Sequence, residues 1–253
     1  MTYNRLELIK NYLDEKKVVS FKELSEAFPD VSLMTIRRDI EKLEYMGMAM
    51  RIRGGAKKIE TETERETAYF KRMKQNPEVK ATLAAKALEF IDTGRSIFID
   101  SGSTMMELAK ILSNIPLSII TSGPNIALEV MKQNEITVNL TGGTLNSNNC
   151  SLAGACALAS LKLLNIDYAF ISPSGYSKNG GFTVGNYADS EVKRAVIKKA
   201  STVIMLMSKD KIDKSLPFTF ASLKDIDIII TDIDKQSSIL KGANKFNVKI
   251  INV

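Results

Sequence analysis

The stretch SLMTIRRDIEKL, residues 32–43, decides the fold of the N-terminal part of this chain. Its large apolar side chains recur at helical spacing and form one narrow stripe, made of Ile36, Ile40 and Leu43. An advance of about 100° per residue places Met34, Arg38 and Glu41 on the opposite side. Arg37 lies on the flank of that side. A short helix with one apolar face and guanidinium groups on the other is suited to the major groove of DNA.

Capping and turn residues mark the helices around this stretch. Ser20 is a predicted N-cap for a helix over residues 21–28, with Glu23 at the capping-box position. A Pro-Asp turn follows, and Ser32 caps the quoted helix. An apolar pattern of helical spacing also covers residues 4–14. Three consecutive helices are therefore expected.

A basic wing is predicted behind the third helix. Gly47 ends that helix, and residues 48–53 alternate as a strand. Gly54 and Gly55 then make a tight turn. Three helices and a hairpin form a winged helix-turn-helix, which we place at residues 1–58.

The predicted DNA contacts lie on the polar face of the third helix and in the wing. We expect them from Ser32, Thr35, Arg37, Arg38, Arg51, Arg53 and Lys57. A bidentate arginine–guanine contact gives about 1–3 kcal/mol of discrimination, while a phosphate contact mainly adds salt-dependent affinity. For Arg37 an ion pair to Asp39 or Glu41 is the alternative. One winged helix offers little contact area, so a homo-oligomer, a dimer or tetramer, is expected.

The charge balance permits a polyanionic partner. The formal net charge is +6, and the pI is about 9.1. Residues 1–58 carry twelve basic and nine acidic side chains, so the basic excess is denser there than in the rest of the chain.

Histidine is absent, and Cys150 and Cys156 are the only cysteines. This composition disfavours a zinc site of the usual kind and removes Ser-His and Cys-His catalysis. We expect both cysteines to be small buried side chains in a reducing compartment. The apolar runs are too short to span a bilayer, and the N-terminus lacks the apolar core of a signal peptide. A cytoplasmic location without membrane contact is expected.

A second domain is predicted at residues 77–253, after a charged linker at residues 59–76. Strands are predicted at residues 96–100, 117–121, 136–141, 168–171, 202–207, 226–231 and 248–252. Helices are predicted at residues 78–91, 104–112, 125–133, 153–164 and 189–200. This alternation predicts an α/β domain with a Rossmann-like, mostly parallel sheet that is covered on both faces.

Four successive predicted strands end in glycine and hydroxyl residues. The loops contain Asp100, Ser101, Gly102, Ser103 and Thr104, then Thr121 and Ser122, then Gly142 and Gly143, and last Gly175. Ligands bind beyond the carboxyl ends of such strands, so these loops predict a pocket for a small, polyhydroxylated anion. Lys193 and Lys211 are candidates to reach its phosphate or hydroxyl groups, and solvated positions are the alternative. Dinucleotide and Walker A fingerprints are both missing, so no cofactor is expected.

Together these motifs resemble the DeoR family of bacterial transcription regulators. In the helix and wing the resemblance rests on residues 35–40, Leu43, Gly47 and residues 51–56. It continues through residues 100–104, 121–122 and 142–143, Gly154, residues 167–171 and Gly175, and so covers nearly the whole chain. It implies a DNA-binding domain joined to a sensor domain similar to sugar-phosphate isomerases. Such regulators usually repress carbohydrate or nucleoside genes until a phosphorylated sugar binds.

Three positions depart from the family pattern. Arg53 stands where the wing usually has histidine, which adds a cation. The second loop reads Thr-Ser-Gly from Thr121 instead of Thr-Asn-Ser. Ser208 replaces an aspartate three residues before Lys211, which puts the usual sugar-hydroxyl contact in doubt.

Two alternatives to a sugar-phosphate-responsive repressor stay open at this point. One is a sugar-phosphate isomerase fused to a DNA-binding module, with Asp100 and a lysine for proton abstraction. The absence of histidine and of an obvious second carboxylate disfavours it, so no catalytic residue and no metal site are expected. The other is a regulator whose pocket has lost its ligand, which Ser208 makes conceivable.

Overall fold

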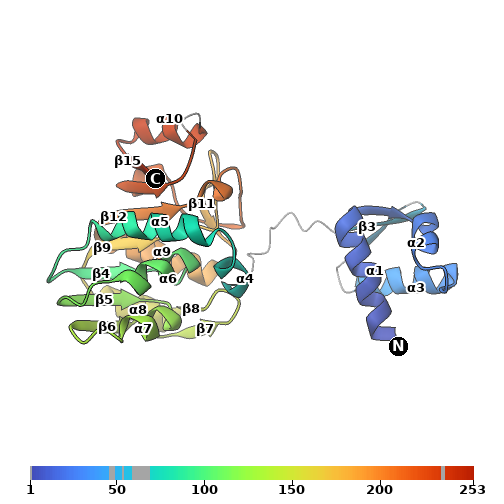
Figure 1. The fold of residues 1–253 in the computed structure, drawn as a ribbon, viewed down its shortest axis with the longest axis horizontal. Helices are drawn as coiled ribbons and strands as arrows, with labels where there is room; N and C mark the ends of the chain where they lie inside the picture. Colours follow the sequence, from blue (N-terminus) through green and yellow to red (C-terminus); the bar gives the residue numbers. More distant parts are fainter. Residues whose placement is uncertain (1, 46–48, 53, 59–68, 235–236) are drawn as a thin grey trace. The chain divides into compact units, whose positions relative to one another are not determined.

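Two separately packed units make up the chain in the computed structural model (Figure 1). They comprise Met1–Glu62 and Thr63–Val253. The structure describes residues 2–45, 49–52, 54–58, 69–234 and 237–253. Each unit has its own hydrophobic core and is described by itself.

The N-terminal unit consists of three helices and a three-stranded antiparallel sheet. The helices are α1 (Thr2–Lys16), α2 (Phe21–Ala27) and α3 (Leu33–Tyr45). The strands are β1 (Val18–Ser20), β2 (Ala49–Ile52) and β3 (Gly55–Lys58), in the order β1-β3-β2. The three predicted helices and the wing strand are confirmed, whereas β1 has no counterpart in the sequence pattern. The predicted end of α3 at Gly47 lies outside the described residues.

The predicted helix caps are confirmed. The Oγ of Ser20 accepts a hydrogen bond from the backbone N–H of Glu23 at 3.1 Å, and the Glu23 carboxylate accepts from the N–H of Ser20 at 2.7 Å. The bond from that N–H, more than any other contact, lowers the pKa of Glu23. At α3, the Oγ of Ser32 accepts from the N–H of Thr35 at 3.3 Å.

The apolar stripe of α3 forms the centre of the N-terminal core. Ile36 and Ile40 are fully buried against α1, α2 and the sheet. On another side of α3, the buried Asp39 pairs with Arg5 of α1, with 2.6 Å between Nε and Oδ2. Packing and this ion pair together fix the orientation of α3 in the unit, and its other face stays exposed.

The second unit is built on a seven-stranded parallel sheet. Its strands are β4 (Ser96–Ile99), β5 (Leu117–Thr121), β6 (Ile136–Leu140), β9 (Ile166–Ile171), β12 (Ala200–Met207), β14 (Ile228–Thr231) and β15 (Lys249–Asn252). Their order is β15-β14-β12-β9-β4-β5-β6, and every neighbouring pair is parallel. The seven predicted strands and the α/β class are therefore confirmed.

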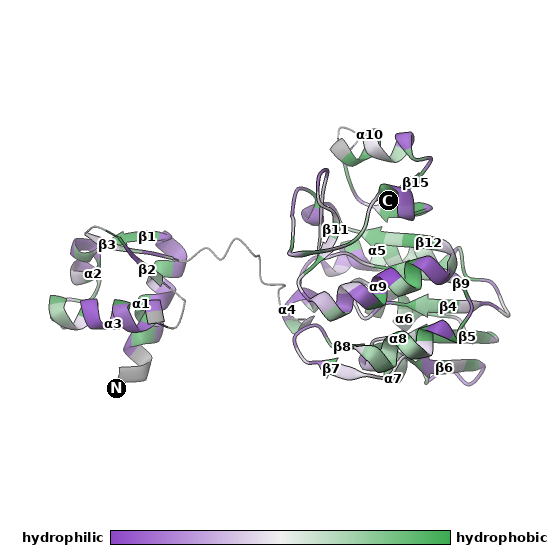
Figure 2. Cartoon of the chain, turned by 180° about the vertical axis from the view of Figure 1, so that it is seen from behind, coloured by the Kyte–Doolittle hydropathy of each residue, from purple (hydrophilic) through white to green (hydrophobic). Residues whose placement is uncertain are grey.

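Helices cover both faces of this sheet (Figures 1 and 2). Helices α5 (Pro77–Leu88), α6 (Ser103–Ile111) and α7 (Pro124–Val130) pack on the face that carries Ile97 and Ile99. Helices α8 (Ala155–Lys162) and α9 (Tyr187–Lys199) pack on the face that carries Phe98. Within the described residues, no helix is both long and apolar enough to cross a membrane.

Smaller elements lie around the sheet and have no counterpart in the prediction. A hairpin of β7 (Thr144–Asn146) and β8 (Ser151–Ala153) follows β6, so α8 begins later than the predicted residue 153. An antiparallel sheet contains β10 (Gly175–Ser177), β11 (Gly181–Val184) and β13 (Phe218–Ala221). Helix α10 (Ser238–Lys245) packs near β15. Strands of three or four residues carry too little periodicity to be recognised in a sequence.

Part of the predicted linker at residues 59–76 is folded. Helix α4 (Tyr69–Met73) packs against α6, and its Tyr69 is buried. The N–H of Tyr69 donates to the carbonyl of Asn148 at 2.7 Å, and its hydroxyl accepts from Nδ2 of Asn125 at 2.6 Å. The preceding residues 59–68 lie outside the described part of the chain.

The expectation of two buried cysteines is wrong. Cys150 is half-buried, Cys156 is exposed, and both are free thiols. The reason at Cys156 is the orientation of α8, which turns Ala157 and Leu161 into the core and leaves its neighbour in solvent.

Candidate nucleic-acid interface and polar pocket

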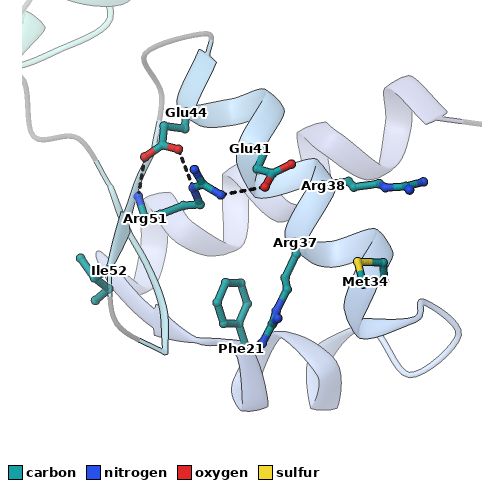
Figure 3. Close-up of a pocket in the computed structure, with 8 residues that line it drawn as sticks. All are labelled: Phe21, Met34, Arg37, Arg38, Glu41, Glu44, Arg51 and Ile52. Atoms are coloured by element: carbon teal, nitrogen blue, oxygen red, sulfur yellow. Dashed lines mark hydrogen bonds and ion pairs between the residues drawn. The ribbon is translucent and has the colours of Figure 1, made fainter.

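An open groove of about 690 Å³ runs between α3 and the wing of the N-terminal unit (Figure 3). Residues from α2, α3 and β2 line it: Phe21, Met34, Arg37, Arg38, Glu41, Glu44, Arg51 and Ile52. Three of these side chains are cationic and two are anionic. The groove coincides with the polar face predicted for the third helix.

Arg37 and Arg38 are exposed on this face, and neither has an acidic partner among the described residues. The guanidinium of Arg37 lies over the ring of Phe21, 5.1 Å from its centroid. Arg38 points away from the other labelled side chains (Figure 3). The predicted alternative, an ion pair of Arg37 to Asp39 or Glu41, is not formed because other arginines occupy both carboxylates.

Arg51 occupies a different environment in the same groove. Its Nη1 lies 2.7 Å from Oε1 of Glu41, and its Nε lies 2.6 Å from Oε2 of Glu44. Its backbone N–H also donates to Oε1 of Glu44 at 3.0 Å, and this bond is the main reason that the pKa of Glu44 is lowered. Glu41 and Glu44 therefore hold Arg51 on α3.

The other predicted DNA contacts that the structure describes do not line the groove. Ser32 and Thr35 join at the start of α3, with 2.9 Å between their hydroxyl oxygens. Lys57 is exposed on β3, and Arg53 lies outside the described residues. Phe21, Met34 and Ile52 also line the groove but are not among the predicted contacts. For Met34, the helical spacing that places it on the same side as Arg38 indicates a position in the groove.

In the second unit, polar side chains gather where the sheet changes direction. The chain proceeds from β4 to β5 on one side and later from β9 to β12 on the other, while β4 and β9 are neighbours. Such a switch point is where parallel α/β sheets bind ligands. Asp100 follows β4 and Ser172 follows β9, so both lie at this point.

A buried ion pair connects the two strand ends. Lys193 of α9 donates to Oδ2 of Asp100, and its Nζ lies 3.3 Å from the carbonyl oxygen of Ser172. The N–H of Ser172 donates to the same Oδ2 at 3.2 Å. Asp100 is 1% exposed and Lys193 is 3% exposed, so the alternative of a solvated Lys193 is wrong. The other carboxylate oxygen, Oδ1 of Asp100, is buried without a hydrogen-bond partner in the described structure.

The loops after β4 and β5 adjoin this pair. A Cβ on Gly102 would lie 3.4 Å from Cβ of Ser172, and one on Gly123 would lie 3.0 Å from Cα of Ser101. Thr121 shapes the second loop because its Oγ1 accepts from the N–H of Gly123 at 3.0 Å. Helix α6 starts after Gly102 without a side-chain cap. Its first N–H groups are therefore suited to an anion.

Several hydroxyl groups of these loops are buried as well. Ser101, Ser103, Thr104, Thr121 and Ser122 are each less than a tenth exposed. The Oγ of Ser122 has no hydrogen-bond partner within the described residues. Buried hydroxyls without partners cost free energy, so this group is poised to bind a polar ligand atom.

Lys211 belongs to a second polar cluster beyond the end of β12. Its Nζ lies 3.0 Å from Oδ2 of Asp210, and Oδ1 of the same carboxylate accepts from the hydroxyl of Ser208. A carboxylate is thus present two residues after Ser208, the position that departs from the family pattern. Nearby Lys80 donates to the carbonyl oxygen of Gln75 at 2.5 Å. Burial and the charge of Lys211 lower the pKa of Lys80 to about 8.

Of the predicted pocket glycines Gly142, Gly143 and Gly175, the last two pack closely against other parts of the unit. A Cβ on Gly143, which has a φ of 103°, would meet the carbonyl oxygen of Ala153 at 2.4 Å. Gly142 precedes it in the same turn before β7, with a φ of 70°. A Cβ on Gly175 would meet the carbonyl oxygen of Lys214 at 2.7 Å. The close approaches at Gly143 and Gly175 shape a turn and strand packing, and within the described residues neither involves Asp100 or Lys193.

Two family models match the chain. One is described as the DeoR-like helix-turn-helix domain and matches residues 5–62. The other is described as the DeoR C terminal sensor domain and matches residues 75–233.

Curated relatives align over almost the whole length. The HTH-type transcriptional regulator GolR of Listeria innocua is 31% identical over 91% of this chain and 90% of its own. The HTH-type transcriptional repressor GlcR of Bacillus subtilis is 30% identical over 90% and 87%. The glycerol-3-phosphate regulon repressor of Escherichia coli is 27% identical over 97% and 95%.

Solved structures show a weaker similarity. A D-ribose-5-phosphate isomerase in complex with phospho-erythronic acid has 19% sequence identity and a TM-score of 0.41, with 55% of each chain covered. The eIF2B delta subunit of Chaetomium thermophilum has 13% identity and a TM-score of 0.44, with 65% of this chain and 60% of that chain covered.

Proposed function

This chain belongs to the DeoR family of transcription regulators, and from that premise we propose that it represses carbohydrate-metabolism genes until a phosphorylated sugar binds. The N-terminal unit binds DNA, and the second unit senses the sugar phosphate. The protein acts in the cytoplasm. It acts as a homo-oligomer, because one winged helix alone has too little contact area for tight operator binding.

The DNA-binding half of the proposal rests on Arg37 and Arg38. Both side chains are exposed on α3 and have no acidic partner among the described residues. With the apolar stripe of α3 buried, this face enters the major groove and the arginines reach guanine edges or phosphates. Met34, which is 63% exposed beside them, is suited to contact a thymine methyl group.

The sensing half rests on one observation, the buried Asp100–Lys193 pair at the switch point. The unpartnered Oδ1 of Asp100 accepts hydrogen bonds from sugar hydroxyls, and the Oγ of Ser122 accepts from them or donates to them. The uncapped N–H groups at the start of α6 bind the phosphate. This arrangement fits a small, polyhydroxylated anion.

Helix α4 connects the pocket to the DNA-binding unit in this proposal. Tyr69 is bonded to Asn125, just after the second pocket loop, and to Asn148 before β8. A ligand that moves these loops therefore moves α4, which follows the segment that joins the two units. Such coupling requires different ligand affinities in the DNA-binding and released states.

We infer binding rather than catalysis at this pocket. The carboxylate of Asp100 is engaged by Lys193, and the chain has no histidine to act as a general base. Detectable isomerisation of ribose 5-phosphate that Asp100→Asn abolishes would reverse this inference.

A thermal-shift screen with a panel of phosphorylated sugars tests the proposed function. A true ligand raises the melting temperature of the wild-type protein by mass action. Asp100→Asn should remove the shift, while Asp92→Asn, an exposed site before β4, should keep it. Any sugar phosphate that raises the melting temperature is then added to a gel-shift assay with the DNA upstream of the protein's own gene, where it should release the DNA. If no sugar phosphate raises the melting temperature, the sensing role is contradicted. If the protein shifts no DNA band, the DNA-binding role is contradicted.

A further inference from the structure

At the base of the wing, Arg51 lies between two carboxylates. Its guanidinium faces Glu41 and Glu44 at 2.7 and 2.6 Å. The three side chains are one third to one half exposed, so they are open to solvent at the groove. Together these three residues carry a net charge of −1, which is unsuited to a phosphate group.

Glu44 also bonds to the backbone of the wing. One of its oxygens accepts from the N–H of Arg51 at 3.0 Å, and the other accepts from the guanidinium of the same residue. Glu41, one turn earlier on α3, takes the other side of that guanidinium. Strand β2 is therefore fastened to the second half of α3 by both its main chain and its side chain (Figure 3).

A phosphate contact by Arg51 would require this arrangement to break. Charge-assisted hydrogen bonds to both carboxylates would be lost, and Glu41 and Glu44 would be left facing the polyanion. Arg37 and Arg38 need no such rearrangement, because no carboxylate holds them in the described structure. The difference separates cations that are available to DNA from one that is not.

We propose that Arg51 is a positioning residue for DNA binding, which docks the wing on α3 through Glu41 and Glu44 and does not contact phosphate. This inference rests on the proposed DNA-binding function. It assigns the contacts on α3 to the first half of the helix. Arg51 sets the angle between α3 and β2, and so the way in which the unit meets the duplex.

The salt dependence of DNA binding distinguishes this role from a phosphate contact. The probe is a labelled duplex that the wild-type protein selects from a random-sequence library. The slope of log K against log salt concentration is negative, and each lost phosphate contact reduces its magnitude by about 0.9. Arg51→Met should bind about tenfold more weakly with the slope unchanged. Arg38→Met removes a cation without an acidic partner from the same groove, and it should make the slope less steep if Arg38 contacts phosphate.

The variant Arg51→Lys gives a second, independent readout. Lysine keeps the charge for a phosphate but cannot bridge two carboxylates in the same geometry. The positioning role predicts that Arg51→Lys loses nearly as much affinity as Arg51→Met, with melting curves that show both variants folded.

Two results would overturn the inference. One is a less steep salt dependence in Arg51→Met, and the other is wild-type affinity in either variant. If the wild-type protein selects no DNA, the proposed function itself fails, and that outcome is distinct from these two.

Discussion

The two units use their cations in opposite ways. Arg37 and Arg38 stand exposed on α3 without acidic partners in the described structure, whereas Lys193 is 3% exposed and paired with Asp100. Exposed charges interact with a partner across water and are screened by salt. A buried pair is shielded from salt, and breaking it leaves an uncompensated charge. Under the proposed function, the exposed pair Arg37 and Arg38 suits a large polyanion, while the buried Asp100–Lys193 pair suits a small enclosed ligand.

Breaking the buried pair should give the largest effect. Lys193→Met leaves the carboxylate of Asp100 buried without its partner, so the second unit should lose about 3–5 kcal/mol of stability. Chemical denaturation followed by circular dichroism measures this loss. Lys198→Met, an exposed site on the same helix, is the matched control and should change stability little. Equal stabilities of the two variants would show that the Asp100–Lys193 pair does not stabilise the second unit.

A cavity-creating substitution in the N-terminal core tests whether the two units unfold independently. Ile36→Ala removes a fully buried side chain from α3 and should cost the N-terminal unit about 2–5 kcal/mol. Because the second unit has its own core, its unfolding transition and its sugar-phosphate thermal shift should remain at wild-type values. A matching decline of both transitions in a melting experiment would mean that the units do not fold separately.

Removing an exposed arginine should leave stability unchanged and weaken DNA binding. For Arg38→Ala we expect a loss of about 1–3 kcal/mol of discrimination at one base pair if the side chain reads guanine. If it contacts phosphate, affinity should fall for all sequences alike, and log K should depend less steeply on log salt concentration. Anisotropy titrations on the selected duplex and on point-substituted duplexes measure both. Wild-type binding by Arg38→Ala would remove it from the interface.

The smallest effect concerns Lys80 and the pH dependence of stability. The pKa of Lys80 is lowered to about 8 in the folded chain, below its value of 10.5 in a solvated side chain. Between these values the unfolded state binds more protons, so the free energy of unfolding should rise with pH. The contribution of Tyr69, whose pKa is raised to about 12, begins only above pH 10.

Denaturation curves between pH 8 and 10 check the expectation for Lys80. The rise should be absent in Lys80→Met, since that variant has no amine to titrate. The charged groups that face Lys80 are Lys211, Asp210, Arg72 and Glu107, and the variant leaves all four in place. A parallel rise in Lys80→Met would assign the effect to other groups.

Local patterns predicted most of the fold. Ile36, Ile40 and Leu43 recur within one helix, and Ser20 and Ser32 act on residues three positions away. Most of the parallel strands contain a short apolar run, such as Ile228–Ile230 in β14. The same local signals are too weak for β7, β8 and β10, whose three residues each hold little periodicity.

The candidate sites depend on contacts between distant residues, and these were predicted less completely. Asp100 and Lys193 were both named, but their pairing joins residues 93 positions apart and depends on β4 and β9 being neighbours. Arg51 is one of the predicted DNA contacts. Its carboxylate partners lie seven and ten positions earlier, across the turn from α3 to the wing, so helical spacing could not reveal them.

The most direct test of the account is a fluorescence-anisotropy titration of a labelled duplex from the chain's own upstream region. The full chain is titrated with and without the sugar phosphate that raises its melting temperature. The account predicts that this ligand weakens DNA binding by about 5- to 150-fold, the usual range of allosteric coupling, and has no effect on Asp100→Asn. The same DNA affinity with every sugar phosphate tested would contradict it.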